Sequence, residues 1–261
     1  MPEEVTWPRF LADFHDSRPG ITDSILGRAR DTTGRTAYDW LVEALPAGSR
    51  ILDLGCGGAP LWPVLAPRPY LGVDSSPAEL AAAASRGAHV VRASATALPV
   101  PDASLDAVAA SMSLMLLPVA AALGEAARVL RPGGLLVALL PSSGPLPVAD
   151  RMRYARLLLT LRTRLRYPGD AELARAAGLF ARSGLALRED TRRVFSYPLP
   201  DASRADELVS SLYLPGVAVA RVERARELAR RWSGSQIGIP LRMLVAVRRD
   251  PDGRPEASDV T

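Results

Sequence analysis

Apolar residues along the chain fall into short runs that alternate with longer stretches of helical spacing. Short apolar runs between turn residues are typical of buried strands, and apolar residues three and four positions apart indicate helices. The predicted strands are 50–54, 70–74, 89–93, 105–110, 134–140, 185–197 and 239–248. The predicted helices between them include 77–86 and 119–130. Alternation of this kind, with nearly continuous apolar strands, predicts a mainly parallel sheet that is covered on both faces.

Further helices are predicted on both sides of this alternating part. Phe10, Leu11 and Phe14 fit one face of a short helix, and a second helix is expected over 21–30 with Thr22 as its cap. The other predicted helices are 36–45, 148–166, 170–183 and a pair within 201–232 that is broken at Leu214, Pro215 and Gly216. The arginine-rich helix 148–166 has two interpretations, a lid packed on the sheet or a surface that docks an anionic group or a membrane.

A glycine-rich turn follows the first predicted strand, and an acidic residue ends the second. Gly55, Gly57 and Gly58 permit a tight turn and a close approach of a ligand to the backbone. Asp74 stands at the end of the neighbouring strand, where a carboxylate can accept two hydrogen bonds from a ribose diol. The combination favours a nucleotide-type binding site over a simple turn and helix cap.

Four sequence blocks in this order resemble the class I S-adenosylmethionine-dependent methyltransferases, in particular the small-molecule, type 11-like group. The blocks are DLGCG at 53–57, LGVDSSP at 71–77, ALPVPDASLDAV at 97–108 and EAARVLRPGGLLV at 125–137. The last block argues against a nicotinamide oxidoreductase, because those enzymes lack RPGG at this place. The resemblance implies a seven-stranded, doubly wound α/β fold of Rossmann-like type, with the last strand inserted antiparallel and a helical cap.

The resemblance also implies a set of cofactor-binding positions for S-adenosylmethionine, whose product is S-adenosylhomocysteine. The positions are Asp53, Gly55, Cys56, Gly57, Asp74, Ser75, Ser94, Ala95 and Ser111. Asp74 would hold the ribose, Ser94 and Ala95 would lie beside the adenine, and Ser111 would border the methionine end. Asp53 has two equal interpretations, fixing the turn or acting near the cofactor ammonium.

Three positions depart from the family pattern. Ala59 replaces a usual glycine, Ser94 replaces a usual aspartate at the adenine, and the stretch 111–118 lacks a histidine that many relatives carry there. A base is needed only if the acceptor must lose a proton. An ordinary surface histidine is the favoured interpretation of His15, and the alternative hypothesis is that it faces the active site as that base or as an orienting group.

Composition narrows the functional classes. All 32 basic residues are arginine, so a lysine Schiff base, a P-loop lysine and a Tyr-x-x-x-Lys reductase pair are excluded. The formal net charge is +4, but the arginines are spread along the chain and 28 acids offset them, which argues against a nucleic-acid partner. Cys56 is the only cysteine, so we expect no cysteine-cluster zinc site and no metal. No stretch is apolar enough to span a bilayer, and the start MPEEVTWPRF is unlike a signal peptide, so a cytoplasmic location is expected.

These observations predict an N-terminal helical lid, a methyltransferase domain and a disordered tail. The expected boundaries are 1–35 for the lid, 36–250 for the domain and 251–261 for the tail, with core segments 36–140, 170–200 and 236–249 and cap insertions 141–169 and 201–235. The favoured function is direct methyl transfer to a small organic acceptor, such as a bacterial secondary metabolite. The alternatives are an RNA or protein methyltransferase, and a cofactor-binding protein without transferase activity or with a rearrangement activity. The oligomeric state stays open, with a homodimer as one option.

Overall fold

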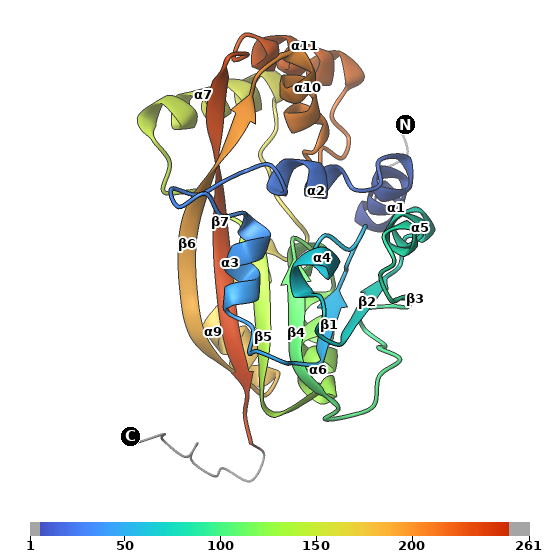
Figure 1. The fold of residues 1–261 in the computed structure, drawn as a ribbon. Coiled ribbons are helices and arrows are strands. Elements are labelled where there is room, and N and C mark those ends of the chain that lie inside the picture. The colour runs from blue at the N-terminus through green and yellow to red at the C-terminus, as the bar shows by residue number, and fades with distance from the viewer. Residues whose placement is uncertain (1–5, 251–261) are drawn as a thin grey trace.

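The strands form the doubly wound, seven-stranded sheet that the family resemblance implies. The structure is a computed structural model that describes residues 6–250, so the predicted tail 251–261 lies outside the described residues. Within the described chain, seven strands form one sheet in the order β3-β2-β1-β4-β5-β7-β6 (Figure 1). The strands are β1 Ile51–Leu54, β2 Tyr70–Asp74, β3 Val90–Arg92, β4 Leu105–Ser111, β5 Leu130–Pro141, β6 Leu185–Leu199 and β7 Ser235–Arg248. β1 to β5 are parallel, and β7 lies antiparallel between β5 and β6, which confirms the predicted topology.

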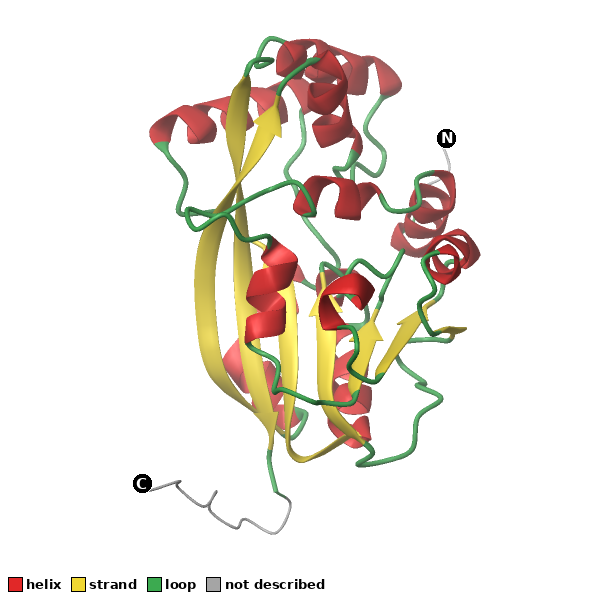
Figure 2. Cartoon of the chain, in the orientation of Figure 1, coloured by secondary structure: helices red, strands yellow, loops and turns green. Residues whose placement is uncertain are grey.

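Helices cover both faces of the sheet, and each face has its own apolar core (Figure 2). The helices of the first half of the chain are α1 Trp7–Ser17, α2 Ile21–Leu26, α3 Ala37–Glu43, α4 Trp62–Leu65, α5 Pro77–Ser85 and α6 Val119–Val129, with a 3₁₀ turn at Leu114–Leu116. On one face, Trp40 and Leu41 of α3 join Ile51 of β1. On the other face, Leu123 of α6 joins Leu52, because neighbouring residues of a strand point to opposite faces.

The two long strands β6 and β7 extend into the upper part of the molecule. The pairing of β5 with β7 ends at Pro141 and Leu241, whereas β6 and β7 remain paired as far as Leu199 and Ser235. This two-stranded extension reaches beyond the rest of the sheet toward the remaining helices of the upper part (Figure 1). Those helices are α7 Val148–Leu161, α10 Ala202–Ser210 and α11 Val219–Arg230. Tyr154 of α7 donates a hydrogen bond to the Gly238 carbonyl oxygen at 3.0 Å, so α7 packs on this extension.

Several predicted helix limits were wrong. α2 ends at Leu26 rather than near residue 30, because the chain then becomes extended and Arg30 exchanges two backbone hydrogen bonds with Ser196 of β6, at 3.0 and 2.6 Å. Its N-cap is Gly20, not Thr22, which lies inside the helix. α7 stops at Leu161 because Arg162 adopts a left-handed conformation with φ of 51°.

The predicted helix 170–183 is two short helices, α8 Asp170–Leu173 and α9 Ala176–Arg182. Arg175 between them has φ of −112° and ψ of 40°, which interrupts the helical hydrogen bonding. Arg242 of β7 donates a hydrogen bond to the Leu173 carbonyl oxygen at 3.1 Å and so satisfies one of the groups that the break frees. A tertiary contact therefore compensates for the break.

Candidate active site

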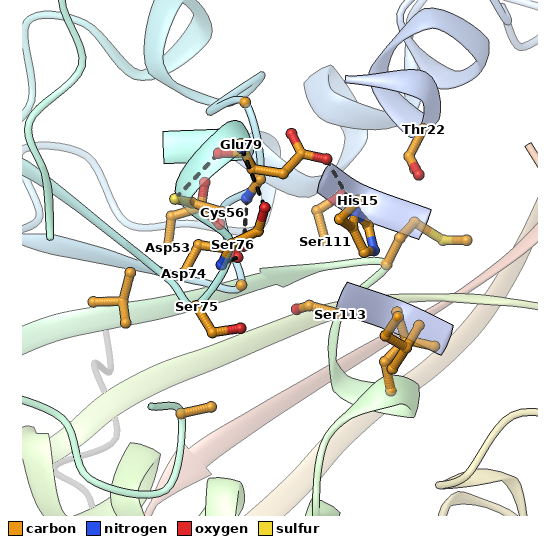
Figure 3. A pocket seen from close by; sticks show the side chains of 18 of the residues that line it. His15, Thr22, Asp53, Cys56, Asp74, Ser75, Ser76, Glu79, Ser111 and Ser113 are labelled. Carbon is orange, nitrogen blue, oxygen red and sulfur yellow. Dashed lines mark hydrogen bonds and ion pairs between the residues drawn. The ribbon is translucent and has the colours of Figure 1, made fainter. Parts of the chain in front are cut away.

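The main cavity lies at the carboxyl ends of β1, β2 and β4, where the strand order reverses. Its volume is about 440 Å³. Its wall includes the turn after β1, the ends of β2 and β4, His15 of α1 and Thr22 of α2 (Figure 3). The loop after α10 contributes Tyr213. Open α/β sheets bind ligands at this place, because strand ends and helix N-termini converge on the gap between diverging connections.

The turn after β1 needs glycine at Gly55. This residue has φ of +68°, and a Cβ atom there would lie 2.5 Å from Cβ of Ser113. Ser113 is held by its own hydrogen bond to the Leu54 carbonyl oxygen at 2.5 Å, so it has little freedom to move away. Gly57 also has a left-handed φ of +51°. The two glycines keep the floor of the cavity free of side chains.

Ala59, which replaces the usual glycine of the family, has a backbone conformation that is unfavourable for alanine. It is fully buried and adopts φ of 54°, a region that favours glycine. The departure from glycine therefore affects the backbone conformation at this position.

Asp74 joins the ends of the first two strands. Its Oδ2 accepts a hydrogen bond from the Gly57 amide at 2.8 Å, and its Oδ1 accepts one from the Ser76 amide at 2.9 Å. Each carboxylate oxygen can accept more than one hydrogen bond, so both retain capacity for a ligand. Asp74 also lines the cavity.

Asp53 is buried below the same turn, with 1% of its surface exposed. Tyr70 donates a hydrogen bond to its Oδ2 at 2.8 Å, and its Oδ1 has no partner in the described part of the chain. Burial raises the pKa of Asp53 to about 7, although the bond from Tyr70 acts in the opposite direction. A buried acceptor atom without a partner at a cavity wall is well suited to a cationic or N–H donor of a ligand.

The other predicted cofactor-binding residues line either the main cavity or a depression that adjoins it. Cys56, Ser75, Ala95 and Ser111 line the main cavity. Ser94 does not, and instead lines a more open depression that shares Ser75 and Ala95 with the main cavity. The Ser94 hydroxyl is 2.8 Å from the Thr96 hydroxyl and accepts a hydrogen bond from the Thr96 amide at 3.2 Å. Burial raises the pKa of the Cys56 thiol, so it remains protonated.

His15 of α1 lies in the cavity wall beside two residues that the sequence did not single out. Its Nδ1 is 2.9 Å from Glu79 Oε1, and its Nε2 is 3.2 Å from the Tyr213 hydroxyl. Glu79 comes from the first turn of α5, and Tyr213 comes from the loop after α10. The three residues are far apart in the chain, and nothing in their local sequence marks them as partners. The only local signal was the polar side chain of Glu79 within an otherwise alanine-rich helix.

Among residues 6–250, no group of three or more histidine, cysteine, aspartate or glutamate side chains is arranged to hold a metal ion. Among the described helices, none is both long and apolar enough to cross a bilayer.

A family model described as "Methyltransferase domain" matches residues 52–138, the segment that contains the glycine-rich turn and Asp74. A demethylmenaquinone methyltransferase of Thermus thermophilus is 33% identical over 185 residues, which are 66% of this chain and 76% of that protein. The chain belongs to the class I S-adenosylmethionine-dependent methyltransferase family. The resemblance noted from the four sequence blocks is thereby confirmed.

Two further similarities describe the extent of this relationship. An uncharacterized methyltransferase of Mycobacterium sp. (strain JLS) is 40% identical over 136 residues, which are 49% of this chain and 54% of that protein. The chain thus spans about half the length of the curated relatives it matches first. The crystal structure of the [4+2]-cyclase SpnF has a TM-score of 0.60 at 21% identity and covers 94% of this chain and 97% of its own. At that identity the likeness shows the shared fold alone.

Proposed function

We propose that the protein binds S-adenosylmethionine in the main cavity and transfers its methyl group to a small organic acceptor. The observation that carries the proposal is the pairing of Asp74 at the end of β2 with the partnerless Oδ1 of Asp53 below the glycine turn. The first is suited to a diol and the second to a cationic nitrogen, and they lie on either side of a backbone that a ligand can approach closely. The chemistry of these groups fits the cofactor of the family.

In this proposal each part of the cavity wall has one task. Asp74 accepts hydrogen bonds from the ribose hydroxyls, and Asp53 accepts one from the methionine ammonium. Gly55 and Gly57 leave room for the methionine chain, and Ser111 borders it. Cys56 and Ser75 complete the wall around these groups. Ser94 and Ala95 stand at the adenine, in the depression that adjoins the cavity.

The chain's own contribution to the reaction is mainly positional. When bound, S-adenosylmethionine supplies an electrophilic methyl group on a sulfonium, so transfer requires an acceptor nucleophile held in line with that methyl group. The cavity wall also has an apolar part, which includes Pro8, Leu11, Met112, Leu116 and Leu117. We infer an apolar or aromatic acceptor, which such a wall would orient while it excludes water. Demethylmenaquinone, named in several relatives, contains an aromatic ring system of this class.

The proposal is tested by calorimetry and by labelled methyl transfer. We expect S-adenosylmethionine and S-adenosylhomocysteine to bind to the purified protein with one site each, and a nicotinamide dinucleotide not to bind. Incubation with methyl-labelled S-adenosylmethionine and short-chain demethylmenaquinol, or with a cell extract fractionated by size, should then place label in small molecules. Absence of binding heat for both adenosyl compounds would disprove the proposed function.

The other functions considered from the sequence give different outcomes in the same experiment. Label in RNA or protein fractions would identify a polymer methyltransferase. Binding without label in any fraction would indicate a cofactor-binding protein that does not transfer the methyl group. A cytoplasmic location and a role in secondary metabolism are parts of the proposal that labelling in the native organism would test.

A further inference from the structure

Glu79, His15 and Tyr213 form a continuous chain of hydrogen bonds in the cavity wall. Glu79 is nearly fully buried, and its side chain bridges two elements. Its Oε1 contacts His15 Nδ1 at 2.9 Å, while its Oε2 accepts a hydrogen bond from the Gly20 amide at 3.0 Å. Figure 3 shows the Glu79 carboxylate extending from α5 toward the imidazole of His15. The carboxylate is thus fixed from both sides and cannot turn away from the ring.

This arrangement determines which nitrogen of His15 carries the proton when the ring is neutral. A carboxylate can only accept, so Nδ1 must be the N–H that faces Glu79. Nε2 is then the free base, and it accepts a hydrogen bond from the Tyr213 hydroxyl at 3.2 Å. The Nδ1–H tautomer therefore satisfies the hydrogen bond to Glu79 and the hydrogen bond from Tyr213 at the same time.

Tyr213 connects this base to the cavity. Its hydroxyl donates to His15 Nε2, so the rest of the Tyr213 oxygen has only lone pairs to offer. A free lone pair can only accept a hydrogen bond. Both Tyr213 and His15 line the cavity, and burial keeps the pKa of Tyr213 above its ordinary value, so its hydroxyl remains protonated.

Resting on the proposed function, we propose that His15 and Tyr213 form a proton relay that deprotonates a hydroxyl-bearing acceptor, with Glu79 as the positioning residue. The proton of the acceptor hydroxyl passes to Tyr213 Oη as the proton of Tyr213 passes to His15 Nε2. The products of this step are the acceptor oxyanion and an imidazolium paired with the Glu79 carboxylate. Tyr213 ends the step as a neutral phenol, so no other reactant is required.

The relay specifies an acceptor class. A phenol, naphthol or hydroquinone offers an O–H donor to the free lone pair of Tyr213 and a flat apolar ring to the rest of the wall. Its oxyanion is a far better nucleophile than its hydroxyl, so proton removal assists methylation at oxygen or at a ring carbon. A neutral amine can attack before it loses a proton and gains little from the relay. The structure therefore favours hydroxyarene acceptors over amines.

The first test uses the tautomer of His15, which does not depend on turnover. The chain has only two histidines, His15 and His89, so their ring nitrogens can be assigned by ¹⁵N NMR with a His89→Ala variant. We expect the Nδ1–H tautomer for His15 at pH 8 and its loss in Glu79→Gln. An Nε2–H tautomer in the unaltered protein, or an unchanged spectrum in Glu79→Gln, would overturn the proposal.

The second test uses a matched pair of acceptor probes, 1-naphthol and 1-naphthylamine, with labelled S-adenosylmethionine. We expect 1-naphthol to be methylated, and His15→Ala to lower kcat for it by about 10²- to 10⁴-fold, with a smaller change in KM. Glu79→Gln and Tyr213→Phe should lower the same kcat. Tyr167→Phe is the control, because Tyr167 packs edge-on against Tyr213 with ring centroids 6.0 Å apart but is not part of the cavity wall.

Calorimetry with S-adenosylhomocysteine separates this inference from the proposed function. If the unaltered protein and the Glu79→Gln variant both bind it, cofactor binding stands, and the relay is judged by the tautomer and by turnover. Unchanged kcat in the His15 and Glu79 variants, or no methylation of 1-naphthol by the unaltered protein, would disprove the relay alone. No binding by the unaltered protein would disprove the proposed function instead.

Discussion

Tyr70 donates a hydrogen bond from its hydroxyl to Asp53 Oδ2 at 2.8 Å across the pair of strands β1 and β2, and Asp53 Oδ1 at the cavity wall has no partner among residues 6–250. One carboxylate therefore has one oxygen fixed by the fold and one free for a ligand. Because both residues are buried in the sheet, this division depends on the packing of the two strands and not on loop conformation.

The buried charge of Asp53 should make the protein less stable as the pH rises. The pKa of Asp53 is about 7 in the folded state against an ordinary value of 3.8, so the folded state retains a proton that the unfolded state loses in this range. Stability associated with this group is present below pH 4 and declines as the pH rises through about 7. In Asp53→Asn we expect the free energy of unfolding at pH 8 to rise by roughly 1–3 kcal/mol, with no gain at pH 4. Urea denaturation at both pH values measures it, with the exposed Asp13→Asn as the control.

The same group should couple cofactor binding to proton release. A cationic ammonium beside Asp53 favours the ionised carboxylate and so lowers its pKa from about 7. Binding of S-adenosylmethionine near pH 6.5 should therefore release part of a proton. Calorimetry in buffers with different ionisation enthalpies measures this number directly. If the unaltered protein and Asp53→Asn release the same number of protons on binding, the released proton does not come from Asp53.

Replacement of Gly55 by alanine should disrupt the floor of the cavity. The added Cβ would lie 2.5 Å from Cβ of Ser113, and the left-handed φ of +68° adds strain. We expect a loss of about 2–4 kcal/mol of stability together with loss of S-adenosylhomocysteine binding. Gly58→Ala is the matched control, because its nearest contact would be 3.5 Å from Glu79 Oε2 and its φ is not left-handed. Similar thermal denaturation of the two variants would contradict this explanation.

Asp74→Asn should weaken cofactor binding more than it weakens the fold. Asn can accept only one of the two backbone hydrogen bonds, from Gly57 and Ser76, that the carboxylate accepts now. Loss of charge-assisted bonds to the ribose should lower affinity for S-adenosylhomocysteine about 10- to 100-fold. Calorimetric dissociation constants measure the effect. An affinity within twofold of the original would show that the ribose is held by other groups.

The strands, and the strand ends that line the cavity, were predictable because their signals are local. The apolar run before Gly55 and the run before Asp74 each define a strand and its end, and parallel strands bring those ends to one edge of the sheet. The limits of α2 and of the predicted helix 170–183 were not predictable, because each depends on a contact with a distant strand. Arg30 pairs with Ser196, and Arg242 binds the Leu173 carbonyl oxygen.

Within the site, Ser94 and His15 also show which features could be predicted from the sequence and which depend on tertiary contacts. From its position in the sequence, Ser94 was expected at the carboxyl ends of the strands. The structure places it in the depression that adjoins the main cavity. His15 was a candidate because of its residue type and its place in the N-terminal segment. Only the fold shows that its two ring nitrogens face Glu79, 64 positions away, and Tyr213, 198 positions away.

The sequence by itself determined the order of strands and helices, the glycine turn and the acid at the end of β2, because these depend on the spacing of apolar residues and on the conformations that individual residues allow. The tertiary structure alone decided the free oxygen of Asp53, the second partner of His15 and the path of the chain over the cavity. Those features depend on which side chains come into contact after the chain has folded and excluded water. The spacing of neighbouring residues in the sequence carries no information about such long-range contacts.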